Sequence, residues 1–141
     1  MFQKILELVV YCLAGIITMM VGYVAIDQMI PCDFPKEIKE GNRSVGWVSA
    51  GIYIGLGIII RTAVQTLTFD REASRMIDGL TDTVFYALVG IVFFLIGYYL
   101  VDLVNRKYNF NEELKANNEA AGIMIFGIFV SIGLIISGVI Q

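Results

Sequence analysis

Two acidic side chains lie at matching places near the ends of apolar segments. Asp27 and Asp102 each follow a tyrosine, Tyr23 and Tyr98, by four residues, so each pair shares one face of a helix. A carboxylate inside a membrane costs roughly 3 kcal/mol unless water or a partner satisfies it, and such residues mark ion or proton paths. The alternative is structural: both aspartates mark where a helix reaches water, with the tyrosines in the interfacial aromatic belt.

Two asparagines extend apolar stripes. Counting back by fours from Asn42 or Asn118 reaches two apolar residues each, so we expect both amides to face protein. Such an amide needs partners, and hydrogen bonds inside a membrane are worth about 0.6 kcal/mol each. We hypothesise that Asp27 and Asn42 pair in one polar node, while Asp102 and Asn118 form a second at the same membrane face. Each node could instead lock a hairpin. The candidate residues of both nodes are Asp27, Asn42, Asp102, Asn118, Tyr23, Tyr98, Glu37 and Glu113.

Little else in the sequence could do chemistry. The 141 residues include no histidine and two cysteines, which removes most zinc, haem and Cys/His catalytic centres. Cys12 and Cys32 are too far apart along one helix to form a disulfide, so we expect free thiols. A formal net charge of −3 without a basic cluster argues against nucleic acid as a partner. We therefore expect no metal, no cofactor and no catalytic centre.

The elements that must position these residues are membrane-spanning helices. The chain is 57% hydrophobic and 16% charged, with a mean hydropathy of +0.76. Its charged residues all lie outside four runs, 8–26, 44–60, 83–101 and 120–141. Each run is close to the ~20 residues that cross a hydrocarbon core of ~30 Å. The first run lacks the basic start and cleavage site of a signal peptide. The sequence therefore predicts an all-α membrane protein with four transmembrane helices.

The chain also reads as a tandem repeat. Residues 33–60 match 109–136 at an offset of 76, and the preceding segments match at an offset of 75. Each unit is a helix, a short polar segment and a helix, so both units cross the membrane in the same orientation. We expect a first two-helix repeat over 1–68 and a second over 81–141, as two tandem hairpins in a parallel-repeat, pseudo-two-fold arrangement.

Three shorter helices are predicted between the spans. Residues 34–41 form one behind the N-cap Asp33, and a second follows Asn109, whose spacing from Glu112 is that of a capping box. Both are expected to lie in the membrane interface. Residues 69–80 carry apolar side chains at helical spacing, which predicts an amphipathic linker helix between the repeats.

Small residues predict where helices approach one another. Lipid supplies no hydrophobic drive between helices, so glycine and serine allow the close backbone contact that holds them together. We expect such contacts within and between the hairpins, with a pore-lining gap as the alternative. The residues are Gly15, Gly22, Gly51, Gly55, Gly90, Gly97, Gly127 and Ser131.

The ends of the spans carry two further signals. Trp47 begins the second span as an interfacial anchor, and Arg61 ends it, where its side chain is expected to reach the interface. The count of basic residues on the two sides gives a weak bias toward both termini outside.

The segment from Phe34 to Asn42, followed by a glycine-rich span and repeated from Phe110 to Gly122, resembles the bacterial membrane family called domain of unknown function 350. The family signature, Glu-x-x-x-x-Asn followed by small residues, falls on Glu37 and Asn42 and again on Glu113 and Asn118. The first copy departs from it after Asn42. The resemblance implies a multi-pass protein of the bacterial inner (plasma) membrane and a peripheral protein partner of the envelope-stress type.

Three functions stay open on these features. We favour a non-catalytic membrane subunit that forms homo-oligomers through its glycine stripes, because packing signals are stronger than chemical ones. The alternative is a small ion channel or transporter whose polar path is lined by Asp27, Asn42, Asp102 and Asn118. An intramembrane enzyme comes last, because the sequence lacks the known catalytic motifs.

Overall fold

The computed structural model describes residues 2–69, 76–105, 107 and 109–141, and the regular structure within these ranges is α-helical. Its helices are α1 (Phe2–Met29), α2 (Phe34–Lys39), α3 (Arg43–Phe69), α4 (Met76–Val104), α5 (Phe110–Lys115) and α6 (Glu119–Ile140). The segments long and apolar enough to cross a membrane are Lys4–Met29, Arg43–Thr66, Asp78–Val104 and Glu119–Ile140. Each of them overlaps one of the four uncharged runs, so the prediction of an all-α protein with four transmembrane helices is confirmed.

The short helices begin at the predicted caps. Asp33 accepts the N–H of Lys36 at 3.1 Å at the start of α2, and Asn109 accepts the N–H of Asn111 at 2.9 Å at the start of α5. α2 ends before residue 41, where it was predicted to end, because Gly41 has a φ of +81°, a left-handed conformation that ends a helix. The interfacial position of both helices stays a prediction.

The described ends of the predicted linker helix over residues 69–80 belong to the neighbouring helices, so they do not form a helix of their own. Phe69 is the last residue of α3, and residues 76–80 form the first turns of α4. Residues 70–75, the middle of the predicted helix, lie outside the described residues. The apolar spacing at its end continues into the fourth helix, which is why α4 starts earlier than the uncharged run.

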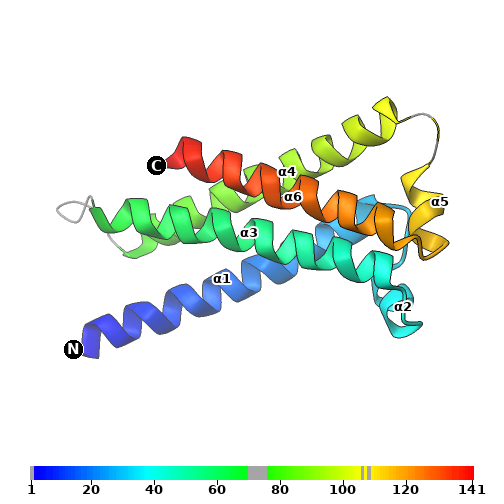
Figure 1. Cartoon of the computed structure of the whole chain (residues 1–141). Helices are drawn as coiled ribbons and strands as arrows, with labels where there is room; N and C mark the ends of the chain where they lie inside the picture. Colours follow the sequence, from blue (N-terminus) through cyan, green and yellow to red (C-terminus); the bar gives the residue numbers. More distant parts are fainter. Residues whose placement is uncertain (1, 70–75, 106, 108) are drawn as a thin grey trace.

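α3 and α6 run parallel, side by side, through the middle of the bundle (Figure 1). α4 contacts both, whereas α1 contacts α3 and α4. The ends of α1 and α4, the starts of α3 and α6, and both short helices lie at the same end of the bundle (Figure 1). The candidate polar residues therefore lie together at one end, which we call the polar end.

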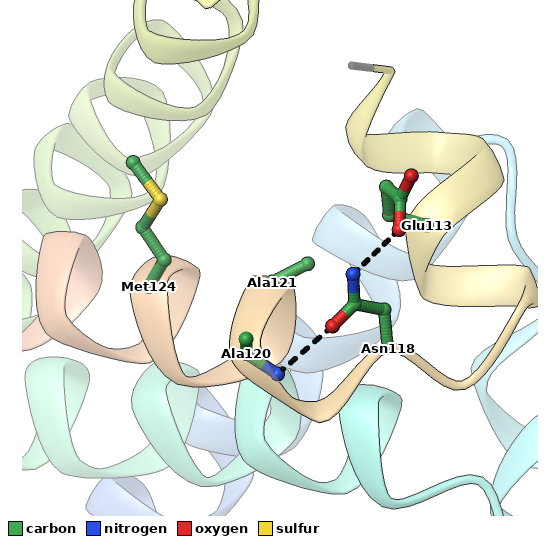
Figure 2. A pocket seen from close by; sticks show the side chains of 5 residues that line it. All are labelled: Glu113, Asn118, Ala120, Ala121 and Met124. Atoms are coloured by element: carbon green, nitrogen blue, oxygen red, sulfur yellow. Dashed lines mark hydrogen bonds between the residues drawn. The ribbon is translucent and has the colours of Figure 1, made fainter.

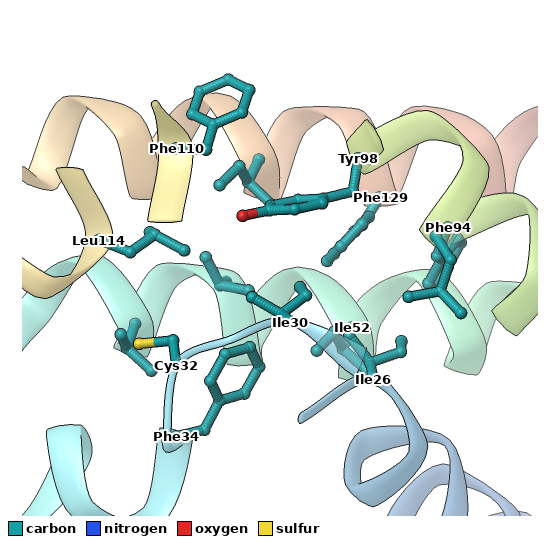
Figure 3. Packing of buried hydrophobic residues seen from close by; sticks show 14 of the residues in the cluster. Ile26, Ile30, Cys32, Phe34, Ile52, Phe94, Tyr98, Phe110, Leu114 and Phe129 are labelled. Atoms are coloured by element: carbon teal, nitrogen blue, oxygen red, sulfur yellow. The ribbon is translucent and has the colours of Figure 1, made fainter. Parts of the chain in front are cut away.

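The hydrophobic core lies toward the polar end. The first residues of the two short helices, Phe34 and Phe110, are completely buried there, together with Tyr98, Ile26 and Leu114 (Figure 3). Packing against these side chains positions α2 and α5 on the spanning helices.

Glycines bring the backbones of α3 and α6 into contact. A Cβ at Gly51 would lie 2.8 Å from the Cα of Phe126, and one at Gly133 would lie 2.7 Å from the carbonyl oxygen of Gly55. A side chain does not fit at such distances, so small residues are required along this contact. Gly122, which the sequence did not single out, faces the backbone of Ser44 in the same way.

The other small residues that the sequence singled out differ in their contacts. Gly22, Gly90 and Gly97 face isoleucine or leucine side chains of neighbouring helices too closely for a Cβ, whereas Gly15 makes only an ordinary contact with Ile60, at 3.6 Å. A correction applies to Gly127 and Ser131: no atom lies within 4 Å of a Cβ at Gly127, and Ser131 is exposed. Both lie on a face of α6 that no other helix covers among the residues that the structure describes.

The contacts between α3 and α6 also differ from those that a two-fold axis between the two helices would give. The contact of Ser44 with Gly122 would then recur between Gly46 and Ala120 at the offset of 76. No atom lies within 4 Å of a Cβ at Gly46, and Ala120 is exposed. The repeat itself stays a prediction from the sequence.

Candidate functional site

The end of α1 holds the start of α2. Asp27 accepts the backbone N–H of Phe34 at 2.8 Å, and the ring of Tyr23 lies edge-on to the Phe34 ring at a centroid distance of 5.9 Å. The first N–H groups of a helix have no partner within the helix, so the carboxylate supplies one. Tyr23 and Asp27 share a helix face, as predicted, and both contact Phe34.

The end of α4 holds α5 by the same means. Asp102 accepts the N–H of Phe110 at 3.0 Å, and the Tyr98 ring lies 5.9 Å from the Phe110 ring. Tyr98 is completely buried, and its hydroxyl donates to Oδ1 of Asn111 at 2.6 Å. Each aspartate therefore ties a short helix to the end of the preceding span.

The amide of Asn42 is fully hydrogen-bonded. Its Nδ2 donates to Oε2 of Glu37 at 2.7 Å and to the carbonyl oxygen of Leu114 at 2.7 Å, and its Oδ1 accepts the N–H of Val45 at 3.1 Å. Asn42 is 6% exposed. It therefore caps α3 and joins that helix to both α2 and α5.

Asn118 makes the corresponding contacts in an open environment. Its Nδ2 donates to Oε2 of Glu113 at 2.6 Å, and its Oδ1 accepts the N–H of Ala120 at 3.2 Å (Figure 2). Asn118 is exposed, unlike Asn42, so the expectation that it faces protein is wrong within the chain. No short helix covers it as α5 covers Asn42.

The predicted pairing within the two nodes is also corrected. Asp27 and Asn42 do not bond to each other, and neither do Asp102 and Asn118; each aspartate binds the start of a short helix, and each asparagine binds a glutamate and caps a span. Backbone N–H groups at helix starts need acceptors, and they take the oxygens that the prediction assigned to side-chain pairs.

Asn117 is a residue of the polar end that sequence reasoning missed. Its φ is +58°, and its Oδ1 accepts the N–H groups of Arg43 at 2.8 Å and Ser44 at 3.3 Å. It thus caps α3 from the other half of the chain. Its alignment with Gly41, together with the tolerance of asparagine for left-handed backbone, was the signal that could have found it.

A second set of contacts joins the starts of α3 and α6. The indole N–H of Trp47 donates to Oε1 of Glu119 at 3.0 Å, and the Arg43 guanidinium lies 3.9 Å from the same carboxylate. The Arg43–Glu119 pair is exposed and adds little stability. The polar end is therefore held across its two halves mainly by capping and indole hydrogen bonds.

A small pocket opens beside Asn118. It has a volume of about 310 Å³ and is lined by Glu113, Asn118, Ala120, Ala121 and Met124 (Figure 2). At the offset of 76 these positions correspond in the first half to residues that are mostly buried, including Ser44, Val45 and Val48. The same motif is thus covered in one half and open in the other.

The chemical groups of the polar end are suited to positioning helices. Burial, with a smaller contribution from Glu37, raises the pKa of the Cys32 thiol from 9.0 to about 11, so this thiol stays protonated at neutral pH. Cys12 and Cys32 are both free, as predicted. Within the described residues no group of three or more metal-binding side chains comes together.

The fold and this end together define a small multi-pass membrane protein whose polar residues tie two short helices to four spans. The chain belongs to the family described as Domain of Unknown Function (DUF350), whose model matches residues 1–140. This confirms the family that the sequence motifs suggested.

Two curated relatives carry the same kind of name. The chain is 24% identical over 123 residues to a UPF0719 transmembrane protein of Aquifex aeolicus (strain VF5), covering 86% of the chain and 44% of the relative. It is 18% identical over 135 residues to the UPF0719 transmembrane protein YshE of Bacillus subtilis (strain 168), covering 96% of the chain and 93% of the relative. The chain thus spans less than half of the Aquifex protein. No solved structure matches it.

Proposed function

We propose that the protein is a non-catalytic membrane subunit that assembles with copies of itself and presents its polar end to a peripheral protein partner of the envelope. The observation that carries this proposal is that the polar side chains hydrogen-bond to the protein's own backbone. Asp27, Asp102 and Asn42 each accept a backbone N–H at the start of a helix, which makes the polar end a fixed surface.

That surface has the charges that a peripheral protein could recognise. Exposed side chains of both signs surround the short helices, and charge complementarity steers and orients such encounters. They are Lys36, Lys39, Glu40, Arg43, Lys107, Glu112 and Lys115.

A small channel or transporter is the competing function, and no observation favours it. The residues expected to line its path lie at one end of the bundle. Deeper in the bundle, the hydroxyls of Ser49, Thr62 and Thr83 donate to carbonyl groups of their own helices at 2.9, 3.0 and 2.8 Å. These buried polar groups are thus satisfied within their helices.

A flux measurement tests the proposal. Purified protein in liposomes is expected to pass ions no faster than protein-free liposomes. The variants Asp27→Asn and Asp102→Asn are suitable controls, because the amide oxygen of asparagine still accepts the N–H of Phe34 or Phe110. Flux in the unaltered protein that both variants abolish would establish the channel and refute a subunit without transport.

The native mass of the detergent-solubilised protein tests its self-assembly. We expect a multiple of the single-chain mass of 15.7 kDa. A single chain that also passes no ions would contradict both functions.

A further inference from the structure

α3 and α6 occupy matching positions in the two halves but are unequally covered. We call the side of α3 that carries Ser44, Gly51, Gly55, Ile59 and Thr62 its front face. The corresponding front face of α6 carries Ala120, Gly127, Ser131, Ile135 and Gly138. Ile59 is 0% exposed, whereas Ile135 is 66% exposed. Ser44 and Thr62 are buried, while Ala120 and Gly138 are exposed.

Within the chain, the front face of α3 packs on a different side of α6, its back face, which carries Gly122, Phe126, Gly133 and Ser137. Gly51 meets Phe126 and Gly55 meets Gly133. At the far end the hydroxyls of Thr62 and Ser137 share a hydrogen bond of 2.6 Å. The contact is therefore front to back, so each helix uses only one of its two faces in it.

The back face of α3 and the front face of α6 take no part in this contact. They are complementary to each other in the same way as the two faces that do. The back face of α3 carries Gly46, Ala50, Gly57 and Arg61, at the positions that match the back face of α6. A Cβ at Gly46 would meet nothing within 4 Å, and one at Gly57 would meet only the Met19 sulfur at 3.9 Å. Gly127 and Gly138 on the unused front face of α6 likewise have no neighbour within 4 Å. The small residues that allow backbone contact are thus present on both unused faces.

A groove between α1 and α3 lies along the unused face of α3. In the second half of the chain α3 fills the space between α4 and α6, where Gly55 meets both Phe94 and Phe129 and Gly90 meets Ile59. The matching space between α1 and α3 is open, with a volume of about 670 Å³ and a lining that includes Cys12, Ile16, Gly57 and Arg61. Ile16 is 50% exposed in it, whereas its counterpart Ile91 is 6% exposed. In the part of the chain that the structure describes, no helix occupies this groove as α3 occupies the space between α4 and α6.

Corresponding residues of the two halves are also unequally buried at the polar end. Leu114 of α5 is completely buried and accepts a hydrogen bond from Asn42, whereas its counterpart Ile38 of α2 is 44% exposed and Asn118 is exposed. One short helix, α5, thus covers the start of the other half's span, whereas α2 packs mainly on α3, the span of its own half.

We propose that α6 of a second copy of this chain packs into the groove between α1 and α3, and repeats between copies the front-to-back contact that joins the two halves within one. This deepens the proposed function, because it rests on self-assembly and names the surfaces that carry it. The copies run parallel, as α3 and α6 do, so both cross the membrane in the same orientation. Arg61 then lies opposite Gly138, where the absence of a side chain leaves room for it. Because the two surfaces differ, the contact is heterologous and closes into a ring of copies or continues as a row.

Cysteine cross-linking between copies tests this contact. The background carries Cys12→Ser and Cys32→Ala. Gly46→Cys is placed in one tagged copy and Ala120→Cys in another, as the counterparts of Ser44 and Gly122. A second pair joins Gly57→Cys with Ser131→Cys. We expect both pairs to give a disulfide-linked product of the two tags in oxidised membranes.

The matched control pairs Ser131→Cys with Ile17→Cys, which lies on the opposite side of α1 from the groove and is 61% exposed. It should give no product. If the protein has a multimeric native mass and neither pair links, the copies meet elsewhere and this inference is overturned while self-assembly stands. If the native mass is that of one chain with lipid retained, lipid fills the groove, and both self-assembly and this contact are refuted.

Discussion

Replacing Asn42 by alanine should lower the free energy of unfolding more than replacing Asn118, because Asn42 is buried and Asn118 is exposed. Asn42→Ala removes the cap of α3, which costs about 1 kcal/mol. It also removes the buried hydrogen bond to the carbonyl of Leu114, which keeps its bond from the backbone N–H of Asn117 at 3.1 Å, so the further cost is about 1 kcal/mol. We therefore expect the free energy of unfolding to fall by about 2 kcal/mol.

Asn118→Ala is the matched control, because the same substitution removes the same kind of cap. Asn118 is exposed, and water can replace its bond to Glu113, so the expected loss is only about 1 kcal/mol. The measurement is denaturant unfolding in detergent in the Gly127→Leu background, which we expect to leave the protein as a single chain. Trp47 is the single tryptophan and lies at the start of α3, so its fluorescence reports the region directly. Equal losses in the two variants, or no loss in Asn42→Ala, would show that the buried bond to Leu114 does not stabilise the protein.

Three further outcomes are expected. Asp27→Ala should lower the free energy of unfolding by about 1 kcal/mol, whereas Asp27→Asn should not, because asparagine keeps an acceptor for Phe34; equal stability of the two variants would contradict that bond. The Cys32 thiol should react with iodoacetamide at pH 8 about a hundredfold more slowly than an unperturbed thiol and accelerate as the pH rises toward its pKa of about 11, because only the thiolate reacts. A rate at pH 8 like that of free cysteine would refute this, measured by mass spectrometry in the Cys12→Ser variant. Gly51→Leu should prevent folding because its side chain would meet the backbone of α6, whereas Gly127→Leu should fold as judged by circular dichroism and reduce the native mass to one chain.

The spans could be predicted because charge is excluded from lipid. All charged residues fall outside four runs of membrane length, and no tertiary contact is needed to see it. The caps Asp33 and Asn109 could also be predicted, because capping acts over only a few residues of sequence.

The partners of the polar side chains could not be predicted, because they depend on which helices approach. Asn42 and Asn118 lie at matching positions, each five residues after a glutamate, but only Asn42 is covered by α5. Gly51 and Gly127 likewise lie at matching positions of matching helices, and only Gly51 touches a backbone. Periodicity gives the face on which a residue lies, whereas the identity of the neighbour depends on the packing of distant segments.

The glycine-lined contact between α3 and α6 has a mechanical consequence. Where backbones meet directly, no long side chains lie between the helices to change rotamer and absorb a displacement. A force applied to α2 or α5 at the polar end should therefore move α3 and α6 together as one rigid body. The N-terminal half of α1 runs away from α3 beside an open groove, so it should bend more readily than these two helices (Figure 1).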